Sequence, residues 1–164
     1  MVQEAFNVGD KVVYPGHGVG KIESVICKSI AGSEQTFFSI VIVDSGMKIL
    51  VPLPQAKAVG LRRVIDRKSI EKVYSILQDR KSKKIDTQTW NRRFREYNQK
   101  IRTGSPFEIA EVLRDLCILS ADKELSFGEK KMFETAQNLL VSEIAIAKSK
   151  TQEKVMTEIQ GLFS

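Results

Sequence analysis

Residues 87–102 read TQTWNRRFREYNQKIR and place an aromatic ring among several guanidinium groups. Trp90 is the only tryptophan of the chain, and Arg92, Arg93 and Arg95 follow it within five residues. An indole can stack on or wedge against an unpaired base, which contributes roughly 1–3 kcal/mol per stacked base. Neighbouring arginines can hold phosphates and supply the salt-dependent part of the affinity. The segment therefore offers chemistry that suits a nucleic acid.

The same tryptophan also fits a structural role. Trp90, Phe94, Tyr97 and Ile101 recur at helical spacing, which is typical of the buried stripe of an amphipathic helix. Trp90 begins this helix after a polar stretch, with Asp86 or Thr87 as the expected N-cap, so it can also lie at the open end of a bundle. Spacing alone leaves the core role and the nucleic-acid role open.

The distribution of charge favours a polyanionic partner. The net charge is +6, and residues 67–102 hold 12 basic and 4 acidic residues. Residues 1–66 are almost neutral, with 7 basic and 6 acidic residues, and residues 103–164 hold 7 basic and 10 acidic residues. A basic patch confined to one segment indicates a binding surface for nucleic acid more strongly than a uniformly basic protein would. No base-reading pattern is evident, so we expect recognition of backbone and shape.

The first part of the chain predicts strands. Residues 12–14, 21–30, 35–44 and 47–53 are rich in β-branched and aromatic residues, and short turns separate them. Several short strands with tight connections predict a small antiparallel barrel. In the last of these strands side chains should alternate between core and solvent, so some of Lys48, Leu50 and Pro52 should be exposed. Such an apolar edge beside a cation could dock a strand of another protein.

From about residue 67 the apolar period becomes helical. Ile70, Val73, Tyr74 and Leu77 mark a first helix, and the Trp90 segment marks a second. SPFE at 105–108 and SFGE at 126–129 predict capping boxes that begin a third and a fourth helix, and a fifth follows Thr151. The predicted fold class is therefore α+β with two domains: residues 1–66 form the barrel and residues 67–164 a compact bundle of about five helices.

Motifs for catalysis or for cofactors are weak. PGHGVGK at 15–21 lacks the spacing and the hydroxyl residue of a phosphate-binding loop, so we interpret it as a β-turn. His17 is the only histidine and has no evident catalytic partners. Cys27 and Cys117 have apolar neighbours, and we expect both to be buried reduced thiols. We predict no enzyme, no metal, no cofactor and no small-molecule substrate.

Targeting signals are not evident either. No apolar run approaches the roughly 18 residues that a transmembrane helix needs, so we expect no membrane partner. The segment MVQEAFNVGDK lacks the pattern of a signal peptide. We therefore expect a cytoplasmic monomer.

Five sequence blocks resemble the CarD/CdnL-type bacterial transcription regulators. They are FNVGDKVVYPGHGVG at 6–20, GMKILVP at 46–52, TWNRRFREY at 89–97, and IAEVLRDL at 109–116 followed by LSFGEKKM at 125–132. The likeness covers nearly the whole chain, and the TWNRR and LSFGEK blocks are specific.

The resemblance implies two binding partners. In the family the N-terminal module is a Tudor-like, SH3-like barrel, shared with the transcription–repair coupling factor, that binds the RNA polymerase β subunit. The helical domain contacts promoter DNA at the upstream edge of the transcription bubble, where it stabilises the open complex. The protein would then be associated with the nucleoid through RNA polymerase.

The resemblance also implies roles for particular residues. It assigns Ile40, Met47, Lys48, Leu50 and Pro52 to the polymerase-binding surface. It also assigns a set that binds DNA: Trp90 would wedge into the minor groove, Arg92, Arg95 and Lys130 would hold the phosphate backbone, and the backbone of Gly104 would approach it at a helix N-terminus. Arg93 joins the predicted DNA-binding residues through its place in the arginine cluster beside Trp90.

Two other interpretations compete with this one. In the first, the protein is an interaction module without DNA contact, Trp90 lies in the core, and the basic patch meets an acidic protein. In the second, the barrel binds RNA. The near-neutral barrel and its lack of aromatic residues at alternate strand positions argue against the second.

Overall fold

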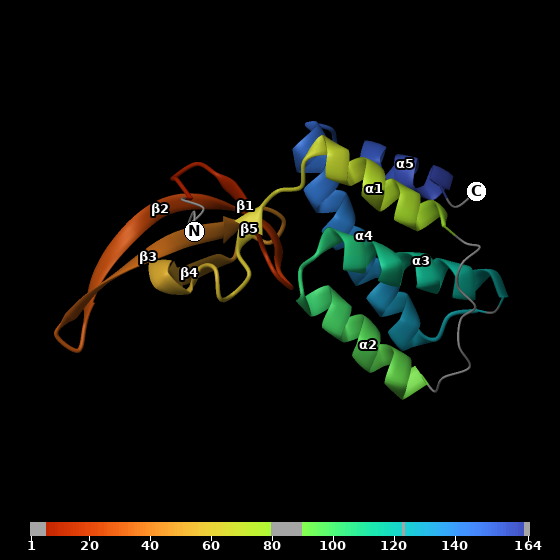
Figure 1. Ribbon diagram of the computed structural model, residues 1–164, viewed down its shortest axis with the longest axis horizontal. Helices are drawn as coiled ribbons and strands as arrows, with labels where there is room; N and C mark the ends of the chain where they lie inside the picture. The colour runs from red at the N-terminus through yellow and green to blue at the C-terminus, as the bar shows by residue number, and fades with distance from the viewer. Residues whose placement is uncertain (1–5, 80–89, 123, 163–164) are drawn as a thin grey trace. The chain divides into compact units, whose positions relative to one another are not determined.

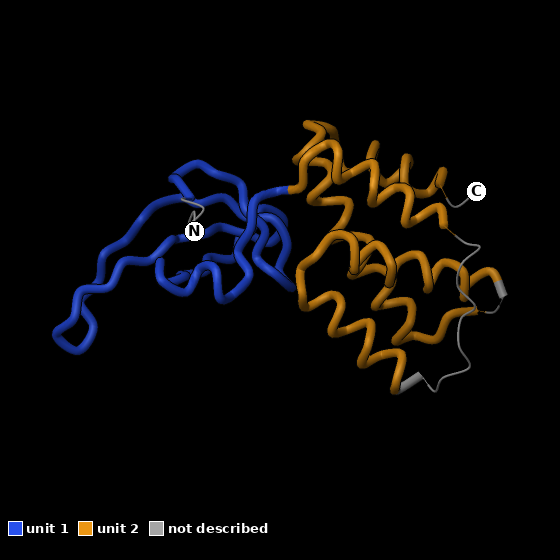
Figure 2. Tube along the Cα trace, in the orientation of Figure 1, with its two compact units in different colours: residues 1–64 blue, residues 65–164 orange. Residues whose placement is uncertain are grey.

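The computed structural model describes residues 6–79, 90–122 and 124–162, without the side chains of Trp90, Asn91 and Asp122. The chain divides into two compact units, residues 1–64 (unit 1) and residues 65–164 (unit 2), as Figure 2 shows. The sequence placed this boundary two residues later. In the described part of the chain, no helix is both long and apolar enough to cross a membrane.

Unit 1 is an antiparallel sheet whose strand order is β4-β3-β2-β1-β5 (Figure 1). Its strands are β1 (Lys11–Tyr14), β2 (Gly18–Ile30), β3 (Ser33–Ile42), β4 (Lys48–Pro52) and β5 (Arg62–Arg63). The first four correspond to the predicted strands, whereas β5 was not predicted. Within the described residues β4 and β5 do not pair, so the expected closed barrel is an open sheet. With only two residues, both paired to β1, β5 offers too little backbone to close it.

Alternation along the strands builds one core on one face of this sheet. Its fully buried members come from β1, β2, β3 and β4 and from the segment that follows β4. They are Val12, Ile22, Phe38, Ile40, Ile42, Val51, Ala56 and Leu61. The period-2 pattern of the sequence thus places the β-branched residues inside, as a half-buried antiparallel sheet requires.

The hairpin of β2 and β3 turns tightly at Ala31 and Gly32. Both residues have positive φ, 50° and 81°, which is the conformation that two-residue hairpin loops need. Towards this turn the side chains of β2 become exposed, and Val25 and Ile30 are both 46% exposed.

The two cysteines are both free thiols, but they differ in exposure. Cys117 is partly buried, whereas Cys27 lies in the exposed part of β2 near the hairpin turn. The prediction of two buried thiols is therefore wrong for Cys27. Its apolar neighbours in the sequence indicate a strand, and this part of the strand extends beyond the core.

Unit 2 contains the five predicted helices (Figure 1). They are α1 (Arg67–Gln78), α2 (Trp90–Arg102), α3 (Pro106–Asp122), α4 (Phe127–Lys148) and α5 (Gln152–Leu162). The periodic apolar residues meet in its core, where Leu113, Leu116, Leu140, Ile144 and Ile159 are buried. The structure is thus α+β, a β unit followed by a helical unit.

The helix starts are set by local hydrogen bonds. The predicted capping box of α4 is present, because the Ser126 and Glu129 side chains each accept from the other's backbone N–H. α3 begins at Pro106 as predicted, but the N–H of Ser105 donates to Oγ1 of Thr103, and Glu108 accepts from the Thr103 hydroxyl. The predicted box between Ser105 and Glu108 is therefore replaced by contacts to Thr103. Asp86 and Thr87, the expected caps of α2, lie outside the described residues.

A polar cluster joins α1, α4 and α5 around Glu158. Its Oε2 accepts from the Tyr74 hydroxyl at 2.8 Å and from Nζ of Lys148 at 3.1 Å, and its Oε1 accepts from Nζ of Lys150 at 2.7 Å. Hydrogen bonds from Lys150, Tyr74 and Lys148 lower the pKa of Glu158 to about 2. The cluster therefore holds the last helix through a carboxylate that stays charged.

Replacing Glu158 with Gln should lower stability in a pH-dependent way. At pH 7 we expect a loss of about 0.5–1 kcal/mol, because solvent screens a side chain that is one-third exposed. The folded-state pKa lies below the ordinary 4.5, so this contribution is complete above that pH and disappears as pH falls through about 2. Urea unfolding at pH 7 and at about pH 3 measures it. An equal loss of stability at both pH values would contradict the stabilising role of the Glu158 charge. So would an equal loss in Glu134→Gln, which changes an exposed residue of α4.

Candidate functional site

The basic helix α2 exposes two of its first three arginines. Arg92 and Arg95 are exposed, whereas Arg93 between them is largely buried. Trp90 is the first residue of α2, and its side chain lies outside the described residues, so its predicted exposure remains a prediction. Two cations predicted to hold phosphates are thus at the surface of this helix.

The buried face of α2 differs from the apolar stripe in the sequence. Tyr97 and Ile101 are buried as expected, but Phe94 is 40% exposed. The third position of the face is taken by Arg93, four residues before Tyr97 and eight before Ile101. Because residues four apart share one side of a helix, the inner face of α2 contains a charged residue where the sequence suggested an aromatic one.

Arg93 is placed differently from the prediction. Its side chain is 11% exposed, and its Nη2 lies 3.8 Å from Oε2 of Glu129, whose side chain is 3% exposed. A guanidinium group held against a buried carboxylate inside the bundle is not at the surface where phosphates bind. The assignment of Arg93 to the phosphate contacts is therefore wrong in this structure, because the helical period turns it inward.

Further polar contacts hold α2 to α3. The Tyr97 hydroxyl lies 3.5 Å from Oδ2 of Asp115, and Oδ1 of the same carboxylate accepts from the Arg114 guanidinium at 3.1 Å. Burial, followed by the nearby Asp115 charge, raises the pKa of Tyr97, so the hydroxyl keeps its proton. Nearer the end of α2, Nζ of Lys100 donates to Glu111 at 2.8 Å. Polar contacts with α3 thus accompany the burial of Tyr97 and Ile101 in docking this helix.

Gly104 ends α2 rather than opening a site on α3. It is buried, its φ is 72°, and its N–H donates to the carbonyl of Ile101 at 3.1 Å. A left-handed glycine directly after a helix is a common C-terminal cap. The predicted role of Gly104, a backbone amide that approaches DNA, is corrected because this amide already closes the last turn of α2.

The first turn of α4 presents a cation and an exposed aromatic ring. The Lys130 side chain is 55% exposed, and its Nζ lies 3.5 Å from Oε1 of Glu124, an exposed pair that contributes little. Phe127 is 84% exposed, more than any other large hydrophobic residue in the described part of the chain. Sequence reasoning missed Phe127. It precedes the core residue Met132 by five positions, about 140° around the helix, and this offset is the signal that could have found it.

The face of β4 opposite the core of unit 1 carries the other candidate surface. Lys48 is exposed and Leu50 is 41% exposed, whereas Val51 is 2% exposed. Met47, just before the strand, is 49% exposed, and Pro52 is partly buried. The predicted alternation along this strand is confirmed, and it places an apolar side chain next to a lysine.

Ile40 does not belong to that surface. It is completely buried and pairs across the sheet with Ile49, on the core side opposite Lys48 and Leu50. It also packs on Gly20, where an added Cβ would lie 2.5 Å from Cγ2 of Ile40. Its assignment to the polymerase-binding surface is therefore corrected, because strand alternation turns it into the core.

The outer edge of β4 has backbone groups available for another strand. The N–H of Ile42 donates to the carbonyl of Met47 at 2.8 Å, so these two residues form a hydrogen-bonded pair in the register of β3 with β4. Hydrogen-bonded and non-hydrogen-bonded pairs alternate along antiparallel strands. Lys48 and Leu50 therefore stand in non-hydrogen-bonded pairs, and their backbone N–H and C=O groups are directed away from β3. In the described residues no strand pairs with this side of β4.

No metal site appears in the described ranges, where no group of three or more His, Cys, Asp or Glu residues could hold an ion. The chemistry that the described residues offer at both candidate surfaces is that of binding, through cations, apolar side chains and a strand edge.

Comparison with known proteins assigns a similarity to each unit. The family model described as "CarD-like/TRCF RID domain" matches residues 6–65, and the model described as "CarD, C-terminal domain" matches residues 72–160. A Bacillus subtilis (strain 168) protein named "Putative transcription factor YdeB" is 32% identical over 150 residues, which cover 92% of this chain and 97% of the relative.

Two solved structures from Myxococcus xanthus are similar to part of the chain. The structure titled CdnLNt is 40% identical and covers 40% of this chain and 92% of its own, with a TM-score of 0.34. The 72-residue N-terminal domain of CarD is 32% identical and covers 38% of this chain and 84% of its own, with a TM-score of 0.32.

The different burial of Ile40 and Leu50 predicts different effects on stability. Ile40→Ala removes a fully buried side chain and should destabilise unit 1 by about 2–4 kcal/mol, through lost transfer energy and the cavity left behind. Leu50→Ala should change stability by about 0.5 kcal/mol or less, as is usual at exposed positions. Urea unfolding followed by circular dichroism measures both, and equal losses would contradict the assignment of the two faces.

Proposed function

Because the chain belongs to the CarD-like family of transcription factors, we propose that it stabilises the open promoter complex by binding RNA polymerase and promoter DNA together. Unit 1 would bind the β subunit, and unit 2 would bind the DNA at the upstream edge of the transcription bubble. The observation that carries the proposal is the pair of exposed arginines on α2, Arg92 and Arg95, in the most basic segment of the chain.

The edge of β4 supports the polymerase contact. It combines backbone groups directed outward with the exposed side chains of Met47, Lys48 and Leu50 and the partly buried Pro52. A peptide that adds a strand to such an edge gains main-chain hydrogen bonds, while the side chains beside it provide specificity. The match of this unit to a domain of the transcription–repair coupling factor points to the same partner.

The exposed cations of unit 2 support the DNA contact. Arg92, Arg95 and Lys130 would hold phosphates, and these contacts position the protein without reading sequence. Trp90 would wedge into the minor groove, as apolar side chains do when they open a base step. The exposed Phe127 on α4 would extend the apolar part of this surface.

A modest binding preference is sufficient for this function. A protein that binds melted promoter DNA more tightly than closed DNA shifts the equilibrium by that difference in affinity alone. A tenfold shift needs about 1.4 kcal/mol, which one wedged ring and a few phosphate contacts can supply. Attachment of unit 1 to the polymerase raises the effective concentration of unit 2 at the DNA. We therefore expect weak binding to free DNA and strong binding to the polymerase–promoter complex.

Trp90→Ala tests the DNA contact. We expect the lifetime of the open complex with purified polymerase to fall about tenfold towards the value without the factor, if the ring contributes about 1.4 kcal/mol. Trp90→Phe is the matched control, which keeps an aromatic wedge and should retain part of the effect. Circular dichroism should show that both variants fold. An unchanged lifetime for Trp90→Ala and for Arg92→Ala would favour an interaction module without DNA contact.

Leu50→Arg tests the polymerase contact. A charged side chain at this exposed position should abolish capture of the isolated β subunit in a pull-down, because it cannot pack against an apolar partner surface. Lys48→Arg, which keeps the charge at the neighbouring exposed position, is the control and should still be captured. Circular dichroism should be unchanged, and loss of the fold in Leu50→Arg would mean that the residue supports the core instead.

A further inference from the structure

We propose that Arg93 and Glu129 form a positioning pair that holds the first turn of α2 against the first turn of α4, without contacting DNA themselves. This inference rests on the proposed DNA contact of unit 2. It gives Glu129, an acidic residue next to the proposed phosphate contacts, a role that supports DNA binding. It also gives the adjacent residues Arg92 and Arg93 different roles.

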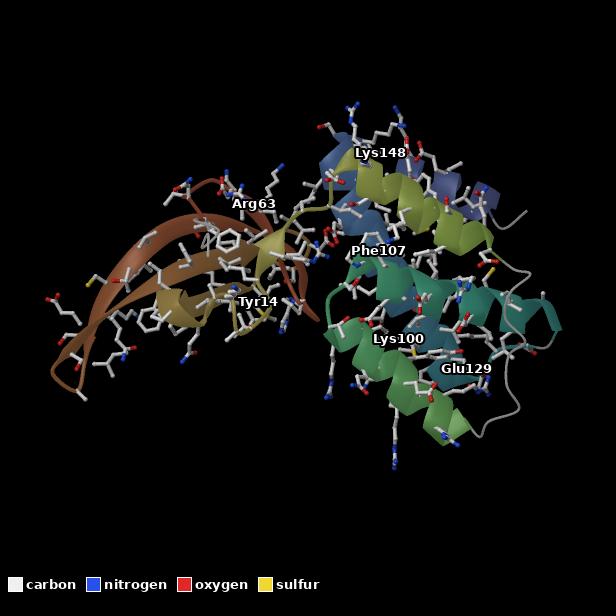
Figure 3. All side chains as sticks on the ribbon, viewed as in Figure 1. Tyr14, Arg63, Lys100, Phe107, Glu129 and Lys148 are labelled. Atoms are coloured by element: carbon white, nitrogen blue, oxygen red, sulfur yellow. The ribbon has the colours of Figure 1, made fainter. Side chains whose placement is uncertain are left out.

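The two carboxylate oxygens of Glu129 serve two helices. Oε1 accepts from the backbone N–H of Ser126 at 2.9 Å and completes the capping box of α4. Oε2 lies 3.8 Å from the guanidinium group of Arg93 on α2. Figure 3 shows Glu129 beside the N-terminal end of α2. One side chain therefore links the start of α4 to the start of α2.

Burial makes this link hard to replace. The side chains of Arg93 and Glu129 are 11% and 3% exposed, so little water is available to solvate either charge. Removing one partner of a buried pair destabilises a protein much more than breaking an exposed pair does. The pair therefore restricts the first turn of α2 to arrangements that keep the two charges together.

The position of the link explains why it matters for binding. Trp90 and Arg92 occupy the turn of α2 that contains Arg93, and Lys130 follows Glu129 directly on α4. A second ion pair of α2, between Lys100 and Glu111, lies two turns later and joins α3 instead. The Arg93–Glu129 pair thus aligns the two elements that carry the proposed phosphate contacts, and the Lys100–Glu111 pair does not.

Glu129→Gln is the decisive variant because the two explanations predict opposite signs. Glutamine keeps an oxygen that can accept from Ser126, so the capping box can persist, but it removes the charge that holds Arg93. If the pair positions α2, the open-complex lifetime should fall at least threefold. If Arg93 binds phosphate and Glu129 only competes for it, the loss of a negative charge should lengthen the lifetime.

Glu111→Gln is the matched control. It removes the same charge from the same unit and also frees a cation of α2, but at the other end of the helix (Figure 3 labels Lys100). The open-complex lifetime with this variant should equal the lifetime with the wild type or be slightly longer. An equal fall in both Gln variants would overturn the proposal, because it would show a general loss of α2 docking.

Substitutions of Arg93 keep the test decisive if thermal unfolding shows that Glu129→Gln folds poorly, and a double variant adds a test of coupling if it folds well. Arg93→Lys keeps the charge and should give a lifetime between those of the wild type and Arg93→Met. The double variant Arg93→Met with Glu129→Gln should be no worse than the more affected single variant, since both remove one interaction. A lifetime of Arg93→Met equal to the wild type, or fully additive effects in the double variant, would overturn the proposal.

The failure of this inference can be told apart from failure of the proposed function. If Trp90→Ala and Arg92→Ala shorten the lifetime and Glu129→Gln does not, DNA contact stands and the positioning role is wrong. If none of these variants shortens the lifetime, unit 2 does not stabilise the open complex and both proposals are wrong.

Discussion

The arrangement of unit 2 depends on how a helix with many charged residues is kept in place. Among the described side chains of α2, a helix of 13 residues, the buried apolar ones are Tyr97 and Ile101. The buried Arg93–Glu129 pair with α4 adds a restraint on the first turn of the helix, whereas the partly exposed Lys100–Glu111 pair with α3 lies two turns later. Such pairs are directional, because they need particular atoms at short distance, whereas apolar contacts tolerate sliding and rotation. The proposed positioning role of Arg93 and Glu129 depends on this directionality.

The packing of α2 gives neighbouring arginines different surroundings. Arg92, Arg93 and Arg95 have the same chemistry, yet the helical period of 3.6 turns Arg93 into the bundle and leaves the other two at the surface. The same principle acts in unit 1 with a period of two. There it buries Ile40 and exposes Leu50 on the neighbouring strand. In both units geometry decides which members of a conspicuous sequence block can meet a partner.

The sequence predicts well whatever depends on local periodicity. The four main strands, the five helices, the capping box at Ser126 and the exposure of Leu50 all follow from spacing and local hydrogen bonding. The open sheet and the exposed Cys27 could not be derived in this way, and neither could the choice of Arg93 over Phe94 for the inner face of α2, since both lie at helical spacing from Tyr97 and Ile101. Each depends on contacts between residues far apart in the chain: the pairing of β5 with β1, the end of the core along β2, and the carboxylate of Glu129. The buried glycine after α2 was misassigned because a glycine before Ser105 fits the end of one helix as well as the start of the next.

Added salt should affect the exposed Arg92 and Arg95 differently from the largely buried Arg93. The proposed contacts between Arg92, Arg95 or Lys130 and phosphates would form at the surface, where the screening length is about 8 Å at physiological ionic strength. Their contribution to affinity therefore falls steeply as salt rises. The Arg93–Glu129 pair is largely removed from solvent, so added salt screens it much less. If unit 2 binds DNA as proposed, added salt should weaken that binding before it loosens α2 from the bundle. The salt dependence of the affinity would then report the phosphate contacts and not the docking of the helix.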